Sequence, residues 1–430
     1  MSDLGPLSCA GEDDRSAAVP IIGYQIKGSM SDPDMQRSDV KFKWLQSLSD
    51  VEREGWDSLA RPLETPFLEW DWLQLMEISG SITAETGWIP RHLTVWSGRE
   101  LVAAAPLYIK IHSAGEFVFD HAWAEVAGRL GRPYYPKLVG MSPFTPMIGY
   151  RFLMASGVDE CELTSRMLAE IERFCRQNGL AGCSYHFVDP TWVETMAGRG
   201  FCPWAHQSFL WENEGFRTFE DYLSRFNANQ RRNIRRERRR LARGGIRVDM
   251  IPGDALPQEL YERMYAFYAQ TNDQFGPWGC KYLTPGFFAA LPGRFRKRLM
   301  FAVASDGGRH HDPPLGMSLL VTKGGHLYGR YWGCAREIEF LHFETCYYRP
   351  LEWAIASGIR RFDPGMGGAH KLRRGFKAVV NHSLHRFMDP ALRQVMERHI
   401  ATINRLEHEE IAALNRHLPL RNLTSSAAEK

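Results

Sequence analysis

The sequence has few of the patterns that assign a chain to a class at once. Its eight cysteines are dispersed and never occur as Cys-x-x-Cys, so neither a zinc ribbon nor a disulfide scaffold is indicated, and a reducing compartment is the simplest interpretation. The longest apolar run, residues 101–109, is about half as long as a membrane-spanning helix. The first residues are polar and acidic and lack the apolar core of an export signal. We therefore expect a soluble, cytoplasmic protein without a transmembrane segment.

An excess of either charge is also missing, except in one segment. The whole chain carries a formal charge of +3. Residues 225–243 contain nine arginines and a single acid, Glu237, and so carry +8, which leaves about −5 for the rest of the chain. Basic character is therefore local, and any attraction for a polyanion is expected from this segment.

The length and the order of the hydrophobic patterns predict two domains. A chain of 430 residues is long for one core. The patterns succeed one another as strand, strand, helix, strand in both halves, at residues 100–188 and 314–365. We predict an α/β (α+β) fold from a duplicated unit with a mixed central sheet in each copy, plus a C-terminal helix. The predicted segments are a disordered leader (1–38), two domains (39–212 and 213–390) and a helix with a tail (391–430).

The basic segment is expected to form one helix from Thr218 to Gly244, with a capping-box start and a Gly-Gly stop. On a helical period, Arg243 and five further arginines share one broad face, opposite a narrow apolar seam. This face suits the phosphates of a tRNA or another phosphate-rich partner, but it is equally a solvated face or one docked on acids of the same chain. Sequence-specific DNA binding is not indicated, because no helix-turn-helix, zinc or heptad pattern accompanies it. The five are Arg231, Arg232, Arg235, Arg236 and Arg239.

A second group of cations follows a predicted strand at residues 360–365. The glycine-rich stretch GMGGAHKLRRGF lets backbone approach a ligand closely, and it places His370, Lys371 and Arg374 within five residues. These side chains suit a carboxylate, a phosphate or a developing oxyanion. A tight turn with exposed basic residues is the alternative.

Proton chemistry is expected at His342 and Glu344, near the start of a predicted helix that contains Pro350. The alternatives are an ordinary acid in a first helical turn and a satisfied core histidine. Because the ends of adjacent strands converge in a sheet of this kind, this helix start and the glycine-rich turn are expected to meet in one pocket.

The first half contains a long aromatic segment, residues 120–149, whose length favours a binding loop. Its polar and aromatic residues suit the lining of a cleft, and packing of the aromatics in the core is the alternative. The candidates are Asp120, His121, Trp123, Tyr134, Tyr135 and Lys137.

Taken together, several segments resemble the Fem-like predicted N-acyltransferases, a peptidoglycan biosynthesis or recognition family within the Gcn5-related acyltransferase (GNAT) superfamily. The resemblance covers about residues 42–390 and implies two tandem GNAT-like domains. At the position of the superfamily's pyrophosphate loop this chain reads GCAREIEFLHFE, which contains no such loop. The resemblance rests on RPYYPKLVGMSPFTPMIG, QSFLWENEGFRTFEDYLSRF with RRNIRRERRRL, YAFYAQTNDQFGPWGCKYLT with FFAAL, LYGRYWGCAREIEFLHFETCYY and DPGMGGAHKLRRGF.

The resemblance also implies an activity. Characterised Fem-type relatives transfer an aminoacyl group from a charged tRNA to an amine on a peptidoglycan precursor, and Lys371, followed by Gly375-Phe376, matches a lysine of their active site. We therefore expect an N-acyltransferase with an aminoacyl-tRNA or an acyl thioester as co-substrate. The expected acceptor is an amine of a small molecule or a peptide, and neither a metal nor a permanently bound cofactor is expected.

The expected roles follow from the chemistry of acyl transfer. The attacking amine must lose a proton, which Glu344, or in second place His342, accepts. Lys371 stabilises the oxyanion, and His370 and Arg374 hold an anionic part of a substrate. Two other classes stay open: a non-catalytic module that recognises a cell-wall precursor, and an RNA-binding protein. Further substrate contacts are expected from Arg330, Trp332, Tyr134, Tyr135 and Lys137.

Overall fold

The structure is a computed structural model, and it describes residues 40–276, 279–307 and 313–421. The predicted leader, Cys9 and the last residues of the predicted tail lie outside the described residues. Within the described ranges, no helix combines the length and the apolar character that crossing a bilayer requires.

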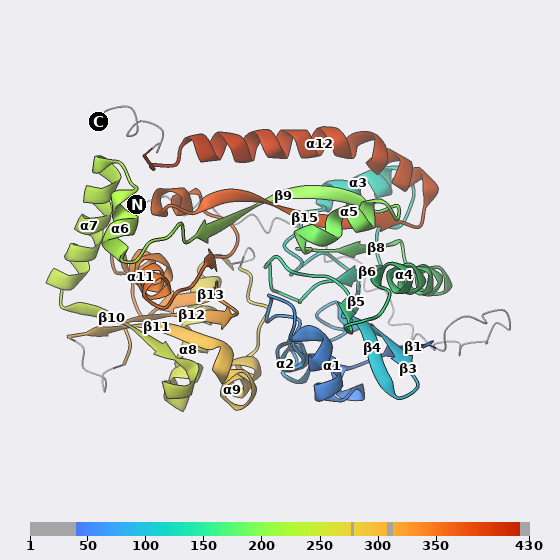
Figure 1. The fold of residues 1–430 in the computed structure, drawn as a ribbon, viewed down its shortest axis with the longest axis horizontal. Helices are drawn as coiled ribbons and strands as arrows, with labels where there is room; N and C mark the ends of the chain where they lie inside the picture. The colour runs from blue at the N-terminus through green and yellow to red at the C-terminus, as the bar shows by residue number, and fades with distance from the viewer. Residues whose placement is uncertain (1–39, 277–278, 308–312, 422–430) are drawn as a thin grey trace.

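The first half of the chain forms short helices around two groups of strands (Figure 1). Its long helix, α4, begins where Asp159 accepts a hydrogen bond from the Glu162 N–H at 2.9 Å, and it buries an apolar face that includes Met167 and Ile171. The helices are α1 (Arg53–Ala60), α2 (Trp70–Ile78), α3 (His121–Arg129), α4 (Glu160–Gln177) and α5 (Pro190–Ala197). The strands are β1 (Val40–Leu45), β2 (Trp88–Pro90), β3 (His92–Ser97), β4 (Glu100–Ala105), β5 (Leu107–Lys110), β6 (Lys137–Gly140), β7 (Leu153–Met154), β8 (Gly182–Tyr185) and β9 (Cys202–Glu212).

The second half repeats the same kinds of element and ends in a long helix. Its strands β11 and β12 are almost continuously buried, as expected for strands covered on both faces. The helices are α6 (Phe219–Ser224), α7 (Ala228–Arg243), α8 (Gln258–Asp273), α9 (Pro285–Arg294), α10 (Leu341–Phe343), α11 (Arg349–Ala356) and α12 (Pro390–Arg416). The strands are β10 (Ile246–Pro252), β11 (Leu299–Asp306), β12 (Gly316–Lys323), β13 (His326–Cys334), β14 (Arg361–Asp363) and β15 (Lys377–Phe387).

The sheet order shows the predicted duplication. A mixed sheet runs in the order β10-β11-β12-β13-β14-β9-β15-β8-β6-β5-β2, beside a smaller sheet β1-β3-β4-β7. Within the large sheet, β6 pairs with β8 in parallel and β13 pairs with β14 in parallel, so each half contributes one crossover unit around a helix. The α/β class with a repeated mixed sheet is therefore confirmed.

The last strand of each half forms backbone hydrogen bonds with strands of the other half. β9 pairs with β14, and β15 lies between β9 and β8 (Figure 1). The two sheets that the duplication predicts are thus joined edge to edge into one. The boundaries at residues 212 and 390 stay predictions, but the two segments share a single hydrogen-bonded sheet.

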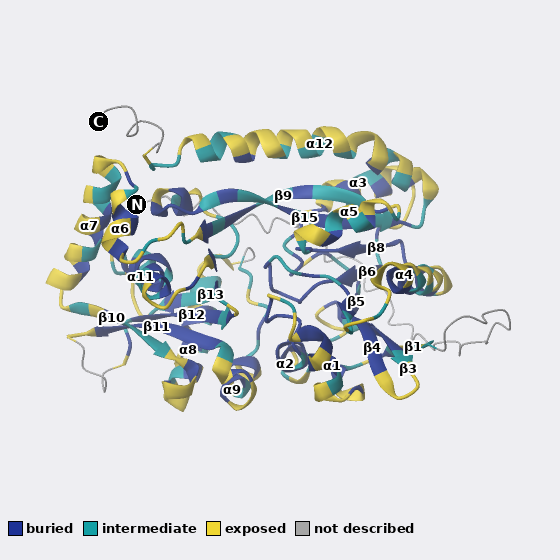
Figure 2. Cartoon of the chain, in the orientation of Figure 1, coloured by how far each residue is buried: buried dark blue, intermediate teal, exposed yellow. Residues whose placement is uncertain are grey.

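The predicted C-terminal helix is confirmed as α12, which lies along β9 and β15 with its outer face exposed (Figure 2). Its amide side chains bond to the backbone of both strands. Asn404 bonds to the Ala205 N–H and to the Pro203 carbonyl, each at 2.8 Å. Asn415 bonds to both backbone groups of Ala378, at 2.9 and 2.8 Å. α12 therefore stabilises β9 and β15, the two strands through which the halves pair.

Two local predictions were wrong. The single helix from Thr218 to Gly244 is divided into α6 and α7, because the Asn227 side chain accepts from the Gln230 N–H at 2.9 Å and caps a new start. The predicted binding loop at residues 120–149 contains α3 and β6. The predicted helix around Pro350 is present as a continuous helical segment from Leu341 to Ala356. A π-turn spans Glu344–Tyr348 within it, and Pro350 follows that turn.

Candidate functional site

A cavity of about 330 Å³ opens in the second half, beside the carboxyl ends of the parallel strands β13 and β14. β12, β13, α8, the π-turn and the glycine-rich turn all contribute to it. No aspartate or glutamate occurs among the described residues that line it. The groups with chemistry in its wall are Arg330, Trp332, His342, Cys346, Tyr347, His370 and Lys371.

Lys371 is the buried cation of this cavity. Its side chain is 3% exposed, and its Nζ donates to the carbonyls of Gly365 at 2.7 Å and Met366 at 2.8 Å. Burial lowers the pKa of Lys371 to about 7, against the opposing effects of Asp363 and Cys346. The ammonium and amine forms are therefore both populated at neutral pH.

The glycine-rich turn makes these contacts possible. Gly365, Gly367 and Gly368 have φ angles of 83°, 73° and 82°, a region that side-chain-bearing residues rarely adopt. A Cβ atom at Gly368 would also lie 2.3 Å from the ring of His370. The turn therefore curls the chain back so that two carbonyls point at the Lys371 amine.

Asp363 is a site residue that the sequence analysis missed. It ends β14, is 8% exposed, and its Oδ1 accepts from the Gly365 N–H at 2.9 Å. Burial raises the pKa of Asp363 to about 6, although the Gly365 N–H, Lys371 and Arg330 lower it. The available signal was its place at the last position of a predicted strand, directly before the glycine-rich turn.

His342 and His370 lie together in the cavity, as predicted, with ring centroids 5.6 Å apart. His370 Nε2 shares a hydrogen bond of 3.0 Å with the Tyr347 hydroxyl, and His342 packs against Trp332 with centroids 4.7 Å apart. Burial first, and neighbouring cations next, lower the pKa of His342 to about 3 and that of His370 to about 4. Both imidazoles are therefore uncharged at neutral pH.

Arg330 reaches the cavity from β13. Its Nη2 donates to the Phe144 carbonyl at 2.6 Å and to the Tyr331 hydroxyl at 2.8 Å. Its guanidinium also packs on the rings of Tyr331 and Phe67, 4.8 and 5.6 Å from their centroids. Its Nε is buried without a hydrogen-bond acceptor among the described residues.

Glu344 does not line this cavity. The Arg238 guanidinium of α7 binds it through Nε at 3.1 Å to both carboxylate oxygens and through Nη2 at 2.9 Å, and bridges on to Glu352 at 2.8 Å. Burial raises the pKa of Glu344 even though Arg238 opposes this. The carboxylate instead faces a groove of about 360 Å³ beside α7.

Arg374 also points away from the cavity. It is 4% exposed, and its guanidinium lies 3.4 Å from the centroid of the Phe343 ring. It donates to the Tyr348 hydroxyl at 3.1 Å, to Glu237 at 3.3 Å and to the His370 carbonyl at 3.0 Å. Arg374 therefore fixes the turn that carries His370, and it ties that turn to α7.

The first-half candidates form a separate buried cluster. Lys137 Nζ donates to Asp120 at 2.5 Å, to Glu116 at 2.8 Å and to Ser113 at 3.1 Å, and the Tyr134 hydroxyl donates to Asp120 at 2.6 Å. The Tyr135 hydroxyl shares a bond of 2.8 Å with Ser113. The structure thus brings together Lys371, His342, His370, Arg330 and Trp332, and separates them from Glu344, Arg374, Tyr134, Tyr135 and Lys137.

The α7 arginines divide into a docked and an exposed group. Ile234, Glu237 and Leu241 face the core, and Arg238 pairs with acids beneath the helix. Arg235 pairs with Glu220. Among the described residues, no carboxylate pairs with Arg231, Arg232, Arg236 or Arg239, of which Arg231 is half-buried and the others are exposed.

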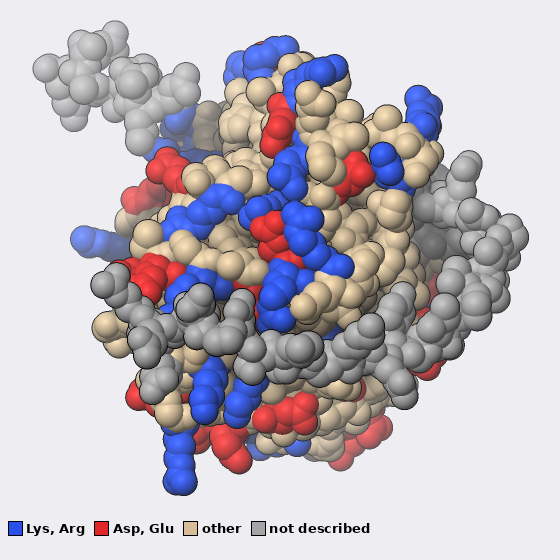
Figure 3. All heavy atoms as spheres, turned by 90° about the vertical axis from the view of Figure 1, so that its right-hand side faces the viewer, with Lys and Arg blue, Asp and Glu red and all other residues tan. Residues whose placement is uncertain are grey.

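The end of the molecule that carries α4 has a different charge pattern. There, Lys and Arg alternate with Asp and Glu over the surface (Figure 3). Arg173 pairs with Glu170 at 2.6 Å and Arg176 with Glu172 at 2.8 Å along α4. α4 is therefore a matched reference for α7: a surface helix whose arginines are neutralised within the same turn.

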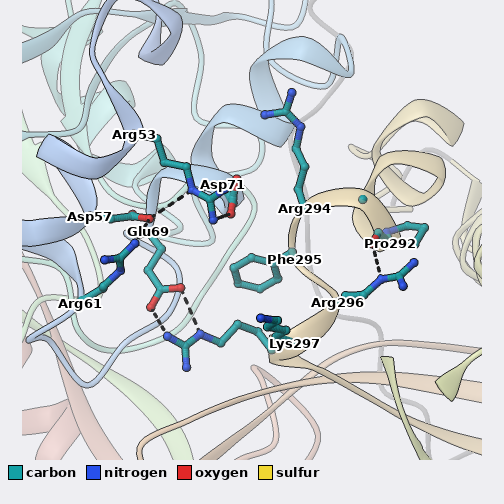
Figure 4. A pocket seen from close by; sticks show the side chains of 12 residues that line it. Arg53, Asp57, Arg61, Glu69, Asp71, Pro292, Arg294, Phe295, Arg296 and Lys297 are labelled. Carbon is teal, nitrogen blue, oxygen red and sulfur yellow. Dashed lines mark hydrogen bonds and ion pairs between the residues drawn. The ribbon is translucent and has the colours of Figure 1, made fainter. Parts of the chain in front are cut away.

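A larger cavity, about 730 Å³, lies between α1 and α2 of one half and the end of α9 in the other (Figure 4). Each of its carboxylates makes an ion pair. Arg53 pairs with Asp71 at 2.5 Å and with Asp57 at 3.6 Å, and Arg298 pairs with Glu69 at 2.8 Å across the two halves. We interpret this cavity as an ionic contact between the halves and place the candidate chemistry at Lys371.

Several solved structures match most of the chain at low identity. FemX matches with a TM-score of 0.49 and 12% identity, over 83% of this chain and 100% of that one. The C-terminal domain of a putative lysylphosphatidylglycerol synthetase from Agrobacterium fabrum matches with a TM-score of 0.46 and 10% identity, over 83% and 97%. A tandem GNAT protein from the clavulanic acid biosynthesis pathway matches with a TM-score of 0.39 and 12% identity, over 82% and 99%.

The comparison with curated proteins gives no match. The comparison with protein families matches residues 47–422, nearly the whole described chain, to the FemAB-like family, described as peptidoglycan biosynthesis/recognition. The protein therefore belongs to the FemAB-like family.

Proposed function

We propose that the protein is an N-acyltransferase that moves an acyl group, aminoacyl groups included, from an activated ester or thioester to a primary amine of a peptidoglycan-type peptide or amino acid. The observation that carries this proposal is Lys371: a buried amine held by two carbonyls in a cavity whose described lining contains no acid. Membership of a peptidoglycan biosynthesis/recognition family supports the class of acceptor.

The reaction needs a base, and we assign this role to Lys371 in place of Glu344. The acceptor nitrogen forms a bond to the acyl carbon, the ester or thioester bond breaks, and the proton of the amine must leave with the donor group. A lysine whose pKa is about 7 can take that proton and return it to the leaving group. Glu344 is held by Arg238 outside the cavity and cannot reach the same atoms.

The surroundings also favour the reactive form of the acceptor. An amine is nucleophilic only when it is unprotonated, and a cavity that lowers the pKa of Lys371 by burial acts in the same direction on any amine bound in it. The developing oxyanion has a donor at hand in Lys371 once that amine has accepted a proton.

Asp363→Asn is expected to move the acidic limb of the pH–rate profile to lower pH. Asp363 raises the pKa of Lys371, so its removal lowers that pKa further from its value of about 7, and the amine becomes available at lower pH. Asparagine keeps the oxygen that accepts from Gly365. The pH dependence of kcat/KM measures the shift, because it reports the free enzyme. A limb that moves upward, or stays in place, would refute Lys371 as the base.

The transfer itself is tested by mass spectrometry of an acceptor pool. The full chain is incubated with extracted peptidoglycan precursors and one donor at a time: total aminoacyl-tRNA, uncharged tRNA, or a set of acyl thioesters. The proposal expects a donor-dependent mass increase on an amine. A recognition module would bind a precursor without modifying it, and that result would remove the enzyme assignment.

We assign a phosphate-rich donor to the exposed face of α7, since its arginines without carboxylate partners form a local positive surface. Arg232→Gln with Arg236→Gln and Arg239→Gln is expected to weaken binding of total tRNA. The slope of log K against the logarithm of the salt concentration should also become shallower by about 2. Each phosphate that an arginine no longer neutralises removes roughly 0.7 from this slope. Filter binding between 50 and 200 mM salt, about the range over which such ionic binding responds, measures this.

The matched control is Arg173→Gln with Arg176→Gln on α4, where glutamates already neutralise the arginines. Equal effects from both sets would mean that α7 has no special role. An RNA-binding protein without the transfer activity would lose affinity with the α7 changes and show no transfer with any donor.

A further inference from the structure

The cavity around Lys371 has an unbalanced set of charges. Arg330 and Lys371 both line it, whereas its described wall contains no acid and its two imidazoles are neutral. Asp363 lies behind the cavity wall, where its carboxylate is close enough to interact with both Lys371 and Arg330. Arg330, which is always charged, and the protonated fraction of Lys371 therefore share one carboxylate. A bound ammonium group would lose its hydration without gaining a counter-charge.

Arg330 has an unused donor. Its Nη2 is occupied by the Phe144 carbonyl and the Tyr331 hydroxyl, while its Nε is buried without an acceptor among the described residues. The guanidinium also stacks on Tyr331 and Phe67, which holds the side chain in place. The guanidinium Nη1 makes no hydrogen bond to a described residue and is not one of the buried donors, so it is the N–H that remains for an acceptor on a ligand.

The size and the wall of the cavity set the kind of ligand. Its volume of about 330 Å³ is at the lower end for small-molecule sites, and the rings of Phe275, Tyr331, Trp332 and Tyr347 line it. Carboxylates pair with guanidinium groups through directional, charge-assisted hydrogen bonds. A compact group of one ring or one side chain with a carboxylate matches both features.

We infer that this cavity selects a substrate group that carries a carboxylate and no positive charge, and that Arg330 is the residue that selects it. The inference rests on the proposed function only for calling the bound group a substrate. An aminoacyl group would accordingly be accepted with its ammonium outside the cavity, and a cationic side chain would be rejected.

Three probes of equal shape test the charge preference on the intact chain: benzoate, benzamide and benzamidinium. Ligand-observed NMR gives each Kd, and protection of Lys371 from acetic anhydride, read by peptide mass spectrometry, shows which probes occupy this cavity. Benzoate is expected to bind at least about tenfold more tightly than benzamidinium and to protect Lys371. Benzamidinium that binds as tightly as benzoate and protects Lys371 would overturn the inference.

Arg330→Gln assigns the effect to one residue. It is expected to reduce benzoate binding to the level of benzamide and to leave benzamide unchanged, whereas Arg336→Gln, at an exposed position outside the cavity, changes neither. Unchanged benzoate binding in Arg330→Gln would contradict the assignment. If that variant does not fold, Arg330→Lys keeps a cation but loses the guanidinium fork, and it is expected to weaken benzoate more than benzamide.

The same variants separate this inference from the proposed function. Probe binding needs no transfer, so a charge preference without any acylation would leave the inference standing and remove the enzyme assignment. Acyl transfer without a charge preference would leave the enzyme assignment standing and remove the inference. Once a substrate pair is known, a rise in KM for the acceptor alone, or for the donor alone, in the Arg330 variant identifies which of the two carries the carboxylate.

Discussion

Lys371→Met is expected to lower the rate of acyl transfer by about 10²- to 10⁴-fold, the usual contribution of a positioned general acid–base group. Methionine fills similar space in an aromatic cavity but cannot carry the proton. Lys371→Arg should be similarly inactive, because a guanidinium does not release its proton at neutral pH. Single-turnover assays measure the loss, and circular dichroism confirms that the variants fold.

Lys377→Met is the matched control, since Lys377 pairs with Glu214 at 2.7 Å on the partly exposed edge of β15, outside the cavity. It should retain the activity of the unmodified chain. If Lys371→Met kept full activity while folded, the base would have to be another group, and the account of this cavity as the reaction centre would fail.

Lys137→Met is expected to cost about 3–5 kcal/mol of the free energy of unfolding, because it leaves two buried carboxylates without their cation. Lys137 is 3% exposed, and Glu116 and Asp120 are fully buried. Although burial alone would lower it, Asp120 and Glu116 raise the pKa of Lys137 above its usual range. Glu116 Oε1 and Asp120 Oδ1 already have no hydrogen-bond partner among the described residues, so loss of the ammonium adds to acceptors that are unsatisfied from the start.

Denaturant unfolding measures this loss, with Arg173→Met as the comparison. The Arg173–Glu170 pair on α4 is partly exposed, so its removal should change stability by at most about 1 kcal/mol. A Lys137 variant as stable as the Arg173 variant would show that the carboxylates take up protons or water at little cost. In that case the cluster would be open to ligands, as the sequence analysis expected of Tyr134, Tyr135 and Lys137.

The sequence predicted elements whose pattern is local. An apolar stripe between capping residues predicted α4 and α12. Closely spaced glycines predicted the turn before Lys371, because they adopt the positive φ angles that this turn contains. The pairing of β9 and β15 with strands of the opposite half was not predictable in this way. Strand pairing joins residues far apart in the chain, and neither strand carries a local signal of its neighbour.

Glu344 shows why the site was only partly predicted. Residues two apart on a helix point to nearly opposite sides, so His342 and Glu344 cannot both face one cavity once the helix has formed. The π-turn that begins at Glu344 and the facing Arg238 complete the separation. Asp363 was missed for the opposite reason: a buried acid at a strand end looks like any strand residue until its neighbours are known.

The most direct test of the central claim, that Lys371 is a buried amine poised for proton transfer, needs no substrate. Competitive labelling with trace acetic anhydride from pH 5 to 10, read peptide by peptide, gives the titration of each lysine. The account predicts that Lys371 labels with a midpoint near 7, well below the usual lysine value of about 10.4. A Lys371 midpoint at that usual value would contradict it.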